Sequence, residues 1–195
     1  MKRFLEWLTL ENIDELTPMQ MIGKGHFAKV YSTQDPNTVM RIEKHGSQDG
    51  VCEKIMKSPE MQNTGGVAKI KGVATKQIDG ELYDVTYKEK VDTNWSKRLG
   101  AIHKEKIESI YPNIDEILKQ MHMGSETAES IGNVPAFIEL VLEKFRSPET
   151  IIQFLKIFPE ADGIIRAIDK GLPYDDLHSD NLGINSKGNL VVIDC

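Results

Sequence analysis

The chain has 195 residues and a formal net charge of −6, with 39% hydrophobic and 28% charged residues, as expected for a globular protein of one domain or two small lobes. The negative charge excludes non-specific nucleic-acid binding from the expected functions, because that mode needs a basic surface that releases counterions. The two cysteines, Cys52 and Cys195, are too few for a disulfide framework or a cysteine-rich zinc site.

No targeting or membrane segment is expected. Glu6 and Glu11 interrupt the apolar residues near the N-terminus, so no signal-peptide core is predicted there. No apolar run approaches the roughly 20 residues needed to span a bilayer. The sequence therefore predicts a soluble, cytoplasmic protein with no membrane partner.

The chain begins with a predicted helical extension over residues 1–18, where apolar residues recur at helical intervals and Pro18 closes the segment. From residue 19 the pattern changes to short β-favouring runs, which glycines and the turn signal Asp35-Pro36-Asn37 separate. These runs lie at 19–22, 29–32 and 38–42. They predict a hairpin followed by a third strand.

A helix at 48–57 and strands at 67–73 and 82–87 complete the predicted β-rich part. From Trp95 onward, about eighty residues lack strand patterns and show the 3.6-residue period of helices instead. Gly171 is expected as a helix C-cap. The predicted helices lie at 107–121, 134–145, 150–158 and 164–170.

An apolar run from Leu190 to Ile193 indicates a final buried strand that stops at Asp194. Strands first, helices second and a last strand pair predict an α+β fold. Its two principal parts are expected at 19–92 and 93–195, the second combining helices with polar loops.

A glycine-rich segment, Gly23-Lys24-Gly25-His26-Phe27-Ala28-Lys29-Val30, lies between two predicted strands. A dinucleotide fingerprint or a Walker loop would open a helix instead. Glycines let a backbone approach phosphate oxygens closely, and this hairpin resembles the phosphate-covering loop of protein kinases, G-x-G-x-x-G-x-V, with Ala28 in place of the third glycine. The resemblance implies nucleotide contacts from Ile22, Gly23, Lys24, Gly25, His26, Phe27, Ala28 and Val30. A plain hairpin turn is the alternative interpretation.

A polar loop followed by a hairpin ends the chain. Protein kinases use a loop Asp to accept the substrate proton, an Asn five residues later to hold Mg²⁺, and a strand-terminal Asp to hold metal. Asp176, Asn181 and Asp194 have the spacing expected of that family. An alternative register takes His178-Ser179-Asp180 with Asn185, but it leaves too few residues before Asp194 for a strand pair and turn. A polar loop without catalytic function is the remaining alternative.

Together these motifs resemble the protein kinase superfamily over residues 19–195, and the chain is similar in size to kinase-like proteins of T7-like bacteriophages. The resemblance implies a two-lobe fold, with a small β-rich N-lobe and a compact helical C-lobe, that binds ATP and Mg²⁺. Arg41 stands where the family has its third-strand lysine, and Glu53 is its expected helix partner. Lys44 and Glu60 are the second choices for these two positions.

Two departures from the family bear on activity. Tyr174-Asp175 replaces the usual His-Arg before the catalytic aspartate, which removes the receptor for a phosphorylated activation loop. The Asp-Phe-Gly motif is reduced to Asp194-Cys195, so the C-lobe is expected to be truncated there. A partner would then supply the substrate-docking surface.

The resemblance implies a serine/threonine-type protein kinase that phosphorylates proteins, which would be host proteins in the host cytoplasm if the chain comes from a phage. One alternative is a pseudokinase-like binding module that occupies a host protein. Another is a small-molecule phosphotransferase of the aminoglycoside-kinase type. No nucleic-acid partner is expected.

Overall fold

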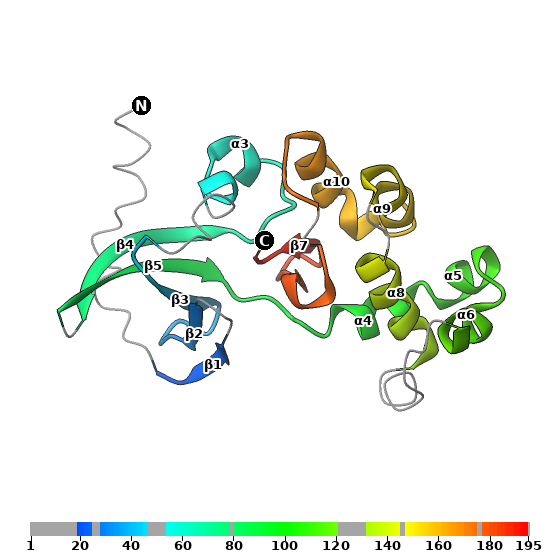
Figure 1. The fold of residues 1–195 in the computed structure, drawn as a ribbon, viewed down its shortest axis with the longest axis horizontal. Coiled ribbons are helices and arrows are strands. Elements are labelled where there is room, and N and C mark those ends of the chain that lie inside the picture. The colour runs from blue at the N-terminus through cyan, green and yellow to red at the C-terminus, as the bar shows by residue number, and fades with distance from the viewer. Residues whose placement is uncertain are drawn as a thin grey trace.

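The computed structural model describes residues 19–24, 28–46, 54–78, 80–120, 132–144, 147–174 and 177–194. The described chain is mixed α+β, as predicted: a five-stranded antiparallel sheet comes first, helices follow, and a two-stranded sheet ends it. In Figure 1 the large sheet lies at one end of an elongated molecule, helices α5 and α6 lie at the other end, and β7 lies between them. The predicted extension at 1–18 and the first part of the predicted helix at 48–57 lie outside the described residues.

The large sheet confirms the predicted hairpin with a third strand and the two later strands. Its order is β1-β2-β3-β5-β4, and every neighbouring pair is antiparallel. The last two strands are longer than predicted, because the alternation continues up to a tight turn where Gly80 has a φ of 85°. The strands are β1 Met21–Lys24, β2 Ala28–Ser32, β3 Thr38–Lys44, β4 Ile70–Ile78 and β5 Glu81–Glu89.

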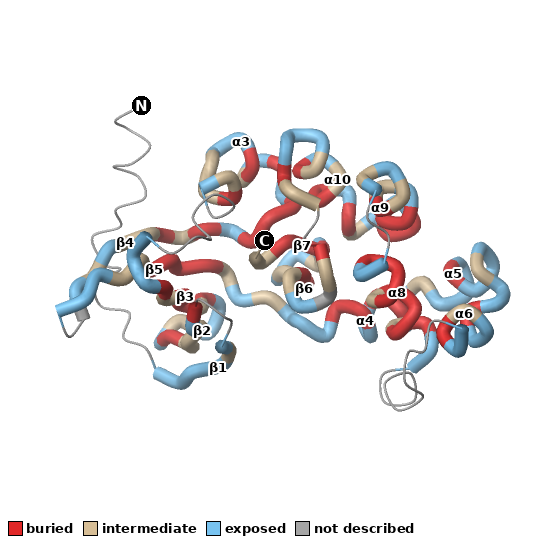
Figure 2. The backbone as a smooth tube through the Cα atoms, viewed as in Figure 1, coloured by how far each residue is buried: buried red, intermediate tan, exposed pale blue. Residues whose placement is uncertain are grey.

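The two faces of this sheet differ in chemistry, because successive side chains of a strand point to opposite faces. One face carries a small apolar cluster of Met40, Val85 and Tyr87. The opposite face carries polar side chains that are nevertheless buried, namely Arg41, Glu43, Thr86 and Lys88. Figure 2 shows the buried stretch of β5 leading toward β7 in the middle of the molecule. The polar face is therefore an internal surface of the protein.

The four helices predicted after residue 95 agree with the structure except at one place, whereas α3 and α4 were not predicted. The segment predicted as one helix over 107–121 forms two, α5 and α6, because Pro112 lies between them and proline cannot continue a helix. Gly171 follows α10 with a φ of 92°, as expected of a C-cap glycine. The helices are α3 Pro59–Gln62, α4 Trp95–Ile102, α5 Lys104–Ile110, α6 Ile114–Gln120, α8 Asn133–Lys144, α9 Pro148–Leu155 and α10 Asp162–Asp169.

Helix α8 lies at the centre of the main core. Its buried side chains pack against α4, α6 and α9, and the aromatic rings of Phe137, Phe154 and Phe158 form a chain of edge-on contacts. Among the described residues no helix combines the length and apolar character needed to cross a membrane.

The small sheet, β6 Leu182–Ile184 with β7 Leu190–Val192, is attached at both edges to the ends of the β4–β5 hairpin. Before β4, Val67 forms a parallel bridge to Val192; after β5, Asp92 forms an antiparallel bridge to Ile184. Val67 was predicted to begin a strand of the large sheet, but it pairs with the small sheet instead. These two bridges hold the end of β7 against the polar face.

A close backbone contact fixes the same region from behind. A side chain at Gly66 would overlap the backbone of Gly163 in α10, so these two segments touch main chain to main chain. The Gly66 carbonyl accepts a hydrogen bond from the Val192 N–H at 2.9 Å. Helix α10 and strand β7 therefore both contact the backbone at Gly66.

Candidate functional site

The candidate site contains two residues that lie far apart in the sequence. Arg41 lies in the middle of β3, and Asp194 is the second residue after the end of β7. An Arg41 Nη atom lies 3.5 Å from the Asp194 carboxylate. The Arg41 side chain is 5% exposed and the Asp194 side chain 42%, so a ligand could reach the carboxylate from solvent. The structure therefore brings together the two residues that the sequence placed at the third strand and at the end of the last strand.

Glu43 is the second carboxylate at Arg41, and the sequence analysis missed it. It lies two residues further along β3, on the same face, and its Oε atom is 2.8 Å from an Arg41 Nη atom. Both side chains are almost fully buried, where solvent screens an ion pair little. The predicted helix partner Glu53 lies outside the described residues. The second choices are placed elsewhere, since Glu60 pairs with Lys170, and Lys44 pairs with Glu81 where the ends of β3 and β5 are exposed.

Lys88 adds a second cation to this face. It lies in β5 and is 4% exposed, and its Nζ donates a hydrogen bond to the Ile193 carbonyl at 3.0 Å. The register pairs Val39 with Lys88 and Arg41 with Thr86, so both cations lie on one face. In the sequence Lys88 directly follows the predicted strand 82–87 and precedes Glu89 and Lys90, so no local pattern marked it as buried. It could not be assigned, because only the sheet register shows which residue it faces.

Asn181 lies next to Asp194 through the backbone. It ends the short 3₁₀ helix η3, Ser179–Asn181, and its carbonyl accepts a hydrogen bond from the Ile193 N–H at 2.8 Å. Its side-chain nitrogen lies 3.1 Å from the His178 Nε2 atom. The proposed metal ligands Asn181 and Asp194 thus come from adjacent backbone segments. The predicted base Asp176 lies outside the described residues.

The alternative register, with Asp180 and Asn185, finds no support in the geometry. Asn185 is the first residue of the turn between β6 and β7, and its side-chain oxygen accepts hydrogen bonds from the N–H groups of Lys187 and Asn189, both at 3.0 Å. This side chain therefore stabilises a turn. Asp180 is exposed.

Both strands of the predicted glycine hairpin, β1 and β2, are present in the structure. Gly23 in β1 pairs with Val30 in β2, and Val30 pairs with Arg41 in β3, so the hairpin begins beside the buried arginine. A side chain at Gly23 would meet Val30 at an ordinary contact distance of 3.6 Å, so space within the protein does not require glycine there. Ile22 and Lys24 are exposed and Ala28 is buried. The predicted Gly25, His26 and Phe27 lie outside the described residues.

The donor types fit the expected ligands. A guanidinium can grip two phosphate oxygens at once, and carboxylate and amide oxygens are the ligands that Mg²⁺ prefers. Among the described residues no group of three or more His, Cys, Asp or Glu side chains is arranged to hold a metal. The metal assignment therefore depends on the oxygens of Asn181 and Asp194.

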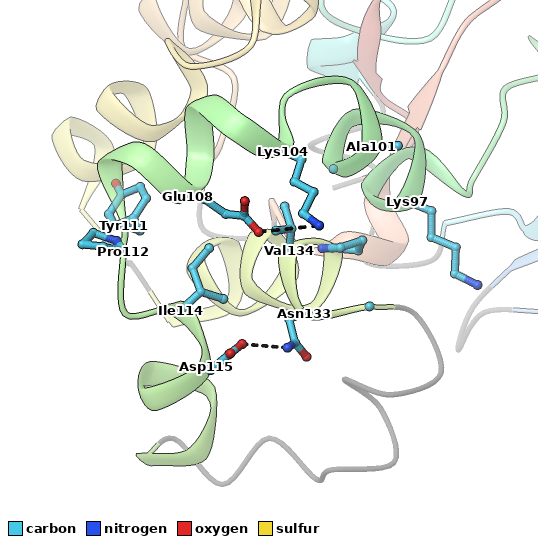
Figure 3. A pocket seen from close by; sticks show the side chains of 13 residues that line it. Lys97, Ala101, Lys104, Glu108, Tyr111, Pro112, Ile114, Asp115, Asn133 and Val134 are labelled. Atoms are coloured by element: carbon cyan, nitrogen blue, oxygen red, sulfur yellow. Dashed lines mark hydrogen bonds and ion pairs between the residues drawn. The ribbon is translucent and has the colours of Figure 1, made fainter.

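A separate hollow lies among helices α4, α5, α6 and α8 (Figure 3). It has a volume of about 570 Å³ and shares no residue with the Arg41–Asp194 site. Its polar groups largely satisfy one another: Lys104 pairs with Glu108 at 3.8 Å, and the Asn133 side chain donates to Asp115 at 2.6 Å. This hollow offers no chemistry comparable to the buried cations and Asp194.

Comparison with family models and with curated proteins identifies no relative. No protein-family model matches the chain, and no curated protein matches its sequence. The interpretation of the site therefore depends on its geometry and on the motifs in the sequence.

Proposed function

We propose that the chain is a protein-kinase-like phosphotransferase with a two-lobe fold, which uses ATP and Mg²⁺ to phosphorylate a serine or threonine of a protein substrate. The observation that carries the proposal is the 3.5 Å approach of Arg41 on the third strand to Asp194 after the last strand. Protein kinases place a phosphate-binding cation on the third strand and a metal-binding aspartate near it. The adjacency of Asn181 and Asp194 is the second supporting observation.

The residues of the site would have different roles, according to their chemical groups. Arg41 would hold phosphate oxygens, and the 2.8 Å contact with Glu43 keeps its guanidinium in place. Asn181 and Asp194 would hold Mg²⁺, which, when bound, neutralises charge on the phosphate oxygens. Asp176, assigned by the sequence motif, would accept the proton of the substrate hydroxyl. Such catalysis depends on positioned charges, which act most strongly where water is excluded.

The test is transfer of labelled phosphate from ATP by the purified chain, alone and with a cell lysate, with and without Mg²⁺. We expect Mg²⁺-dependent labelling of serine or threonine. Asp194→Asn should lower the rate by about a thousand-fold or more, because a charged ligand acting on the transition state is removed. Asp169→Asn is the matched control, since Asp169 is an exposed carboxylate at the end of α10. Unchanged turnover in Asp194→Asn would contradict the assignment.

A pseudokinase-like binding module is the second candidate, and the arginine at position 41 favours it. The guanidinium is larger than a lysine ammonium and forks differently, which changes the position of a bound phosphate more than its affinity. This candidate predicts that ATP raises the melting temperature in a concentration-dependent way, as for any ligand of the folded state, while no phosphate is transferred to any protein.

A further inference from the structure

Lys88 has an uncommon location for a lysine. Its side chain is buried within β5, and its Nζ donates to the backbone carbonyl of Ile193 at 3.0 Å. Burial of an ammonium group is unfavourable unless the surrounding groups compensate for lost water. The site in which it is buried is the end of the strand that carries Asp194.

The backbone just before Asp194 is held from two sides. The Ile193 carbonyl accepts the hydrogen bond from Lys88, and the Ile193 N–H donates to the Asn181 carbonyl at 2.8 Å. The next side chain, that of Asp194, lies beside Arg41. Because Lys88 and Arg41 project from neighbouring strands on the same face, two cations of the large sheet fix two consecutive residues after β7.

We infer that Lys88 is a positioning residue: it fixes the Ile193 carbonyl and thereby sets the direction in which the Asp194 carboxylate leaves the strand. The consequence for metal binding rests on the proposed function, in which Asp194 holds Mg²⁺. The restraint of the Ile193 backbone by Lys88 does not rest on the proposed function, because it can be measured without any ligand. The two parts can be measured separately.

Amide hydrogen exchange tests the restraint. Lys88→Met removes the ammonium group but keeps the apolar stem of the side chain. We expect the Ile193 amide to exchange about ten-fold faster or more than in the wild type, because a hydrogen bond to a charged group is lost. Amides of the β2–β3 pairing should keep their wild-type rates. Lys88→Arg should restore protection, and Lys90→Met, at an exposed position of the same chain segment, should change nothing.

A second variant distinguishes the loss of this hydrogen bond from a general loss of stability. Lys88→Gln keeps a polar end that is too short to reach Ile193, and it should show the same local acceleration. Equal acceleration throughout the chain in both variants would overturn the inference, because a general loss of stability would then explain the effect. Unchanged exchange at Ile193 would also overturn it, because the hydrogen bond would then not restrain this backbone.

The Mg²⁺ requirement is the functional readout. With ATP in excess, Lys88→Met should need about ten-fold more Mg²⁺ for half-maximal stabilisation of the protein, and Lys88→Arg should need the wild-type concentration. An unchanged Mg²⁺ requirement, together with faster exchange at Ile193, would refute the link between this restraint and metal binding. If the wild type shows no stabilisation by ATP with Mg²⁺, the proposed function fails, and the exchange rates still decide whether Lys88 positions this backbone.

Discussion

Replacing Gly66 by alanine should destabilise the protein strongly. The added methyl group would overlap the carbonyl of Gly163 and lie 2.5 Å from the nitrogen of Ile164. Ordinary overpacking of a core costs about 1–3 kcal/mol, and here the obstructing atoms are helix backbone, which cannot rotate away. We therefore expect a loss near the upper limit, about 3 kcal/mol. For a chain of this size that loss corresponds to a fall of about 6–12 °C in melting temperature.

Thermal unfolding followed by circular dichroism measures this shift. Gly23→Ala is the matched control, because its methyl group would meet Val30 at an ordinary 3.6 Å, and its melting temperature should stay close to that of the wild type. Equal melting temperatures for Gly66→Ala and Gly23→Ala would refute the reasoning from the close contact. Because the Gly66 carbonyl binds the Val192 N–H, Gly66→Ala should also weaken stabilisation by ATP with Mg²⁺.

Three further changes should have smaller or more local effects. Hydrogen bonds from the Thr38 side chain, the Asn37 N–H and Lys71 lower the pKa of Asp35 to about 2, below its unfolded value of 3.8. The ionised Asp35 therefore stabilises the folded protein above pH 3.8, and this stabilisation is lost as the pH falls from about 5 through 2. Asp35→Asn should therefore flatten the acid side of the stability profile measured by urea unfolding. Ser147→Ala removes the side chain that caps α9 through the Thr150 N–H and should cost about 1 kcal/mol in urea unfolding. Arg41→Met should abolish stabilisation by ATP, whereas Lys44→Met should not, as a thermal-shift titration would show.

Each of these changes has its own control. Asp169→Asn should leave the acid limb of the profile as in the wild type, and an identical flattening in both variants would argue against Asp35. Ser186→Ala, in the exposed turn between β6 and β7, should have little effect; a loss as large as that of Ser147→Ala would contradict the capping argument. Loss of ATP stabilisation in Lys44→Met would favour Lys44 as the phosphate cation.

Local patterns in the sequence predicted most of the fold. The 3.6-residue period located the helices that became α8, α9 and α10. Helices α9 and α10 are amphipathic, whereas α8 is buried over most of its surface. Glycines and the turn signal located the hairpin and third strand, and the apolar run at the end of the chain located β7. The motif singled out Arg41 and Asp194 separately, as a phosphate-binding and a metal-binding residue, but it did not predict their contact with each other.

Features that depend on distant contacts were not predictable. Glu43 could have been placed on the face of Arg41 by the two-residue period of a strand, but nothing local distinguishes an internal face from an exposed one. Lys88 required the register of β3 with β5 and the location of Ile193, which is 105 residues away in the sequence. Val67 shows the same limit, since its strand-like residues pair with β7 rather than with the large sheet.

The two bridges from the β4–β5 hairpin have a mechanical consequence. Val67 and Asp92 lie just outside the two ends of this hairpin and pair with opposite edges of the small sheet, while Lys88 and Arg41 contact the residues that follow β7. Bending of the large sheet about the line that joins the two bridges would leave both bridges intact and would stretch the contacts of Lys88 and Arg41. The distance from Arg41 to Asp194 would therefore report such bending.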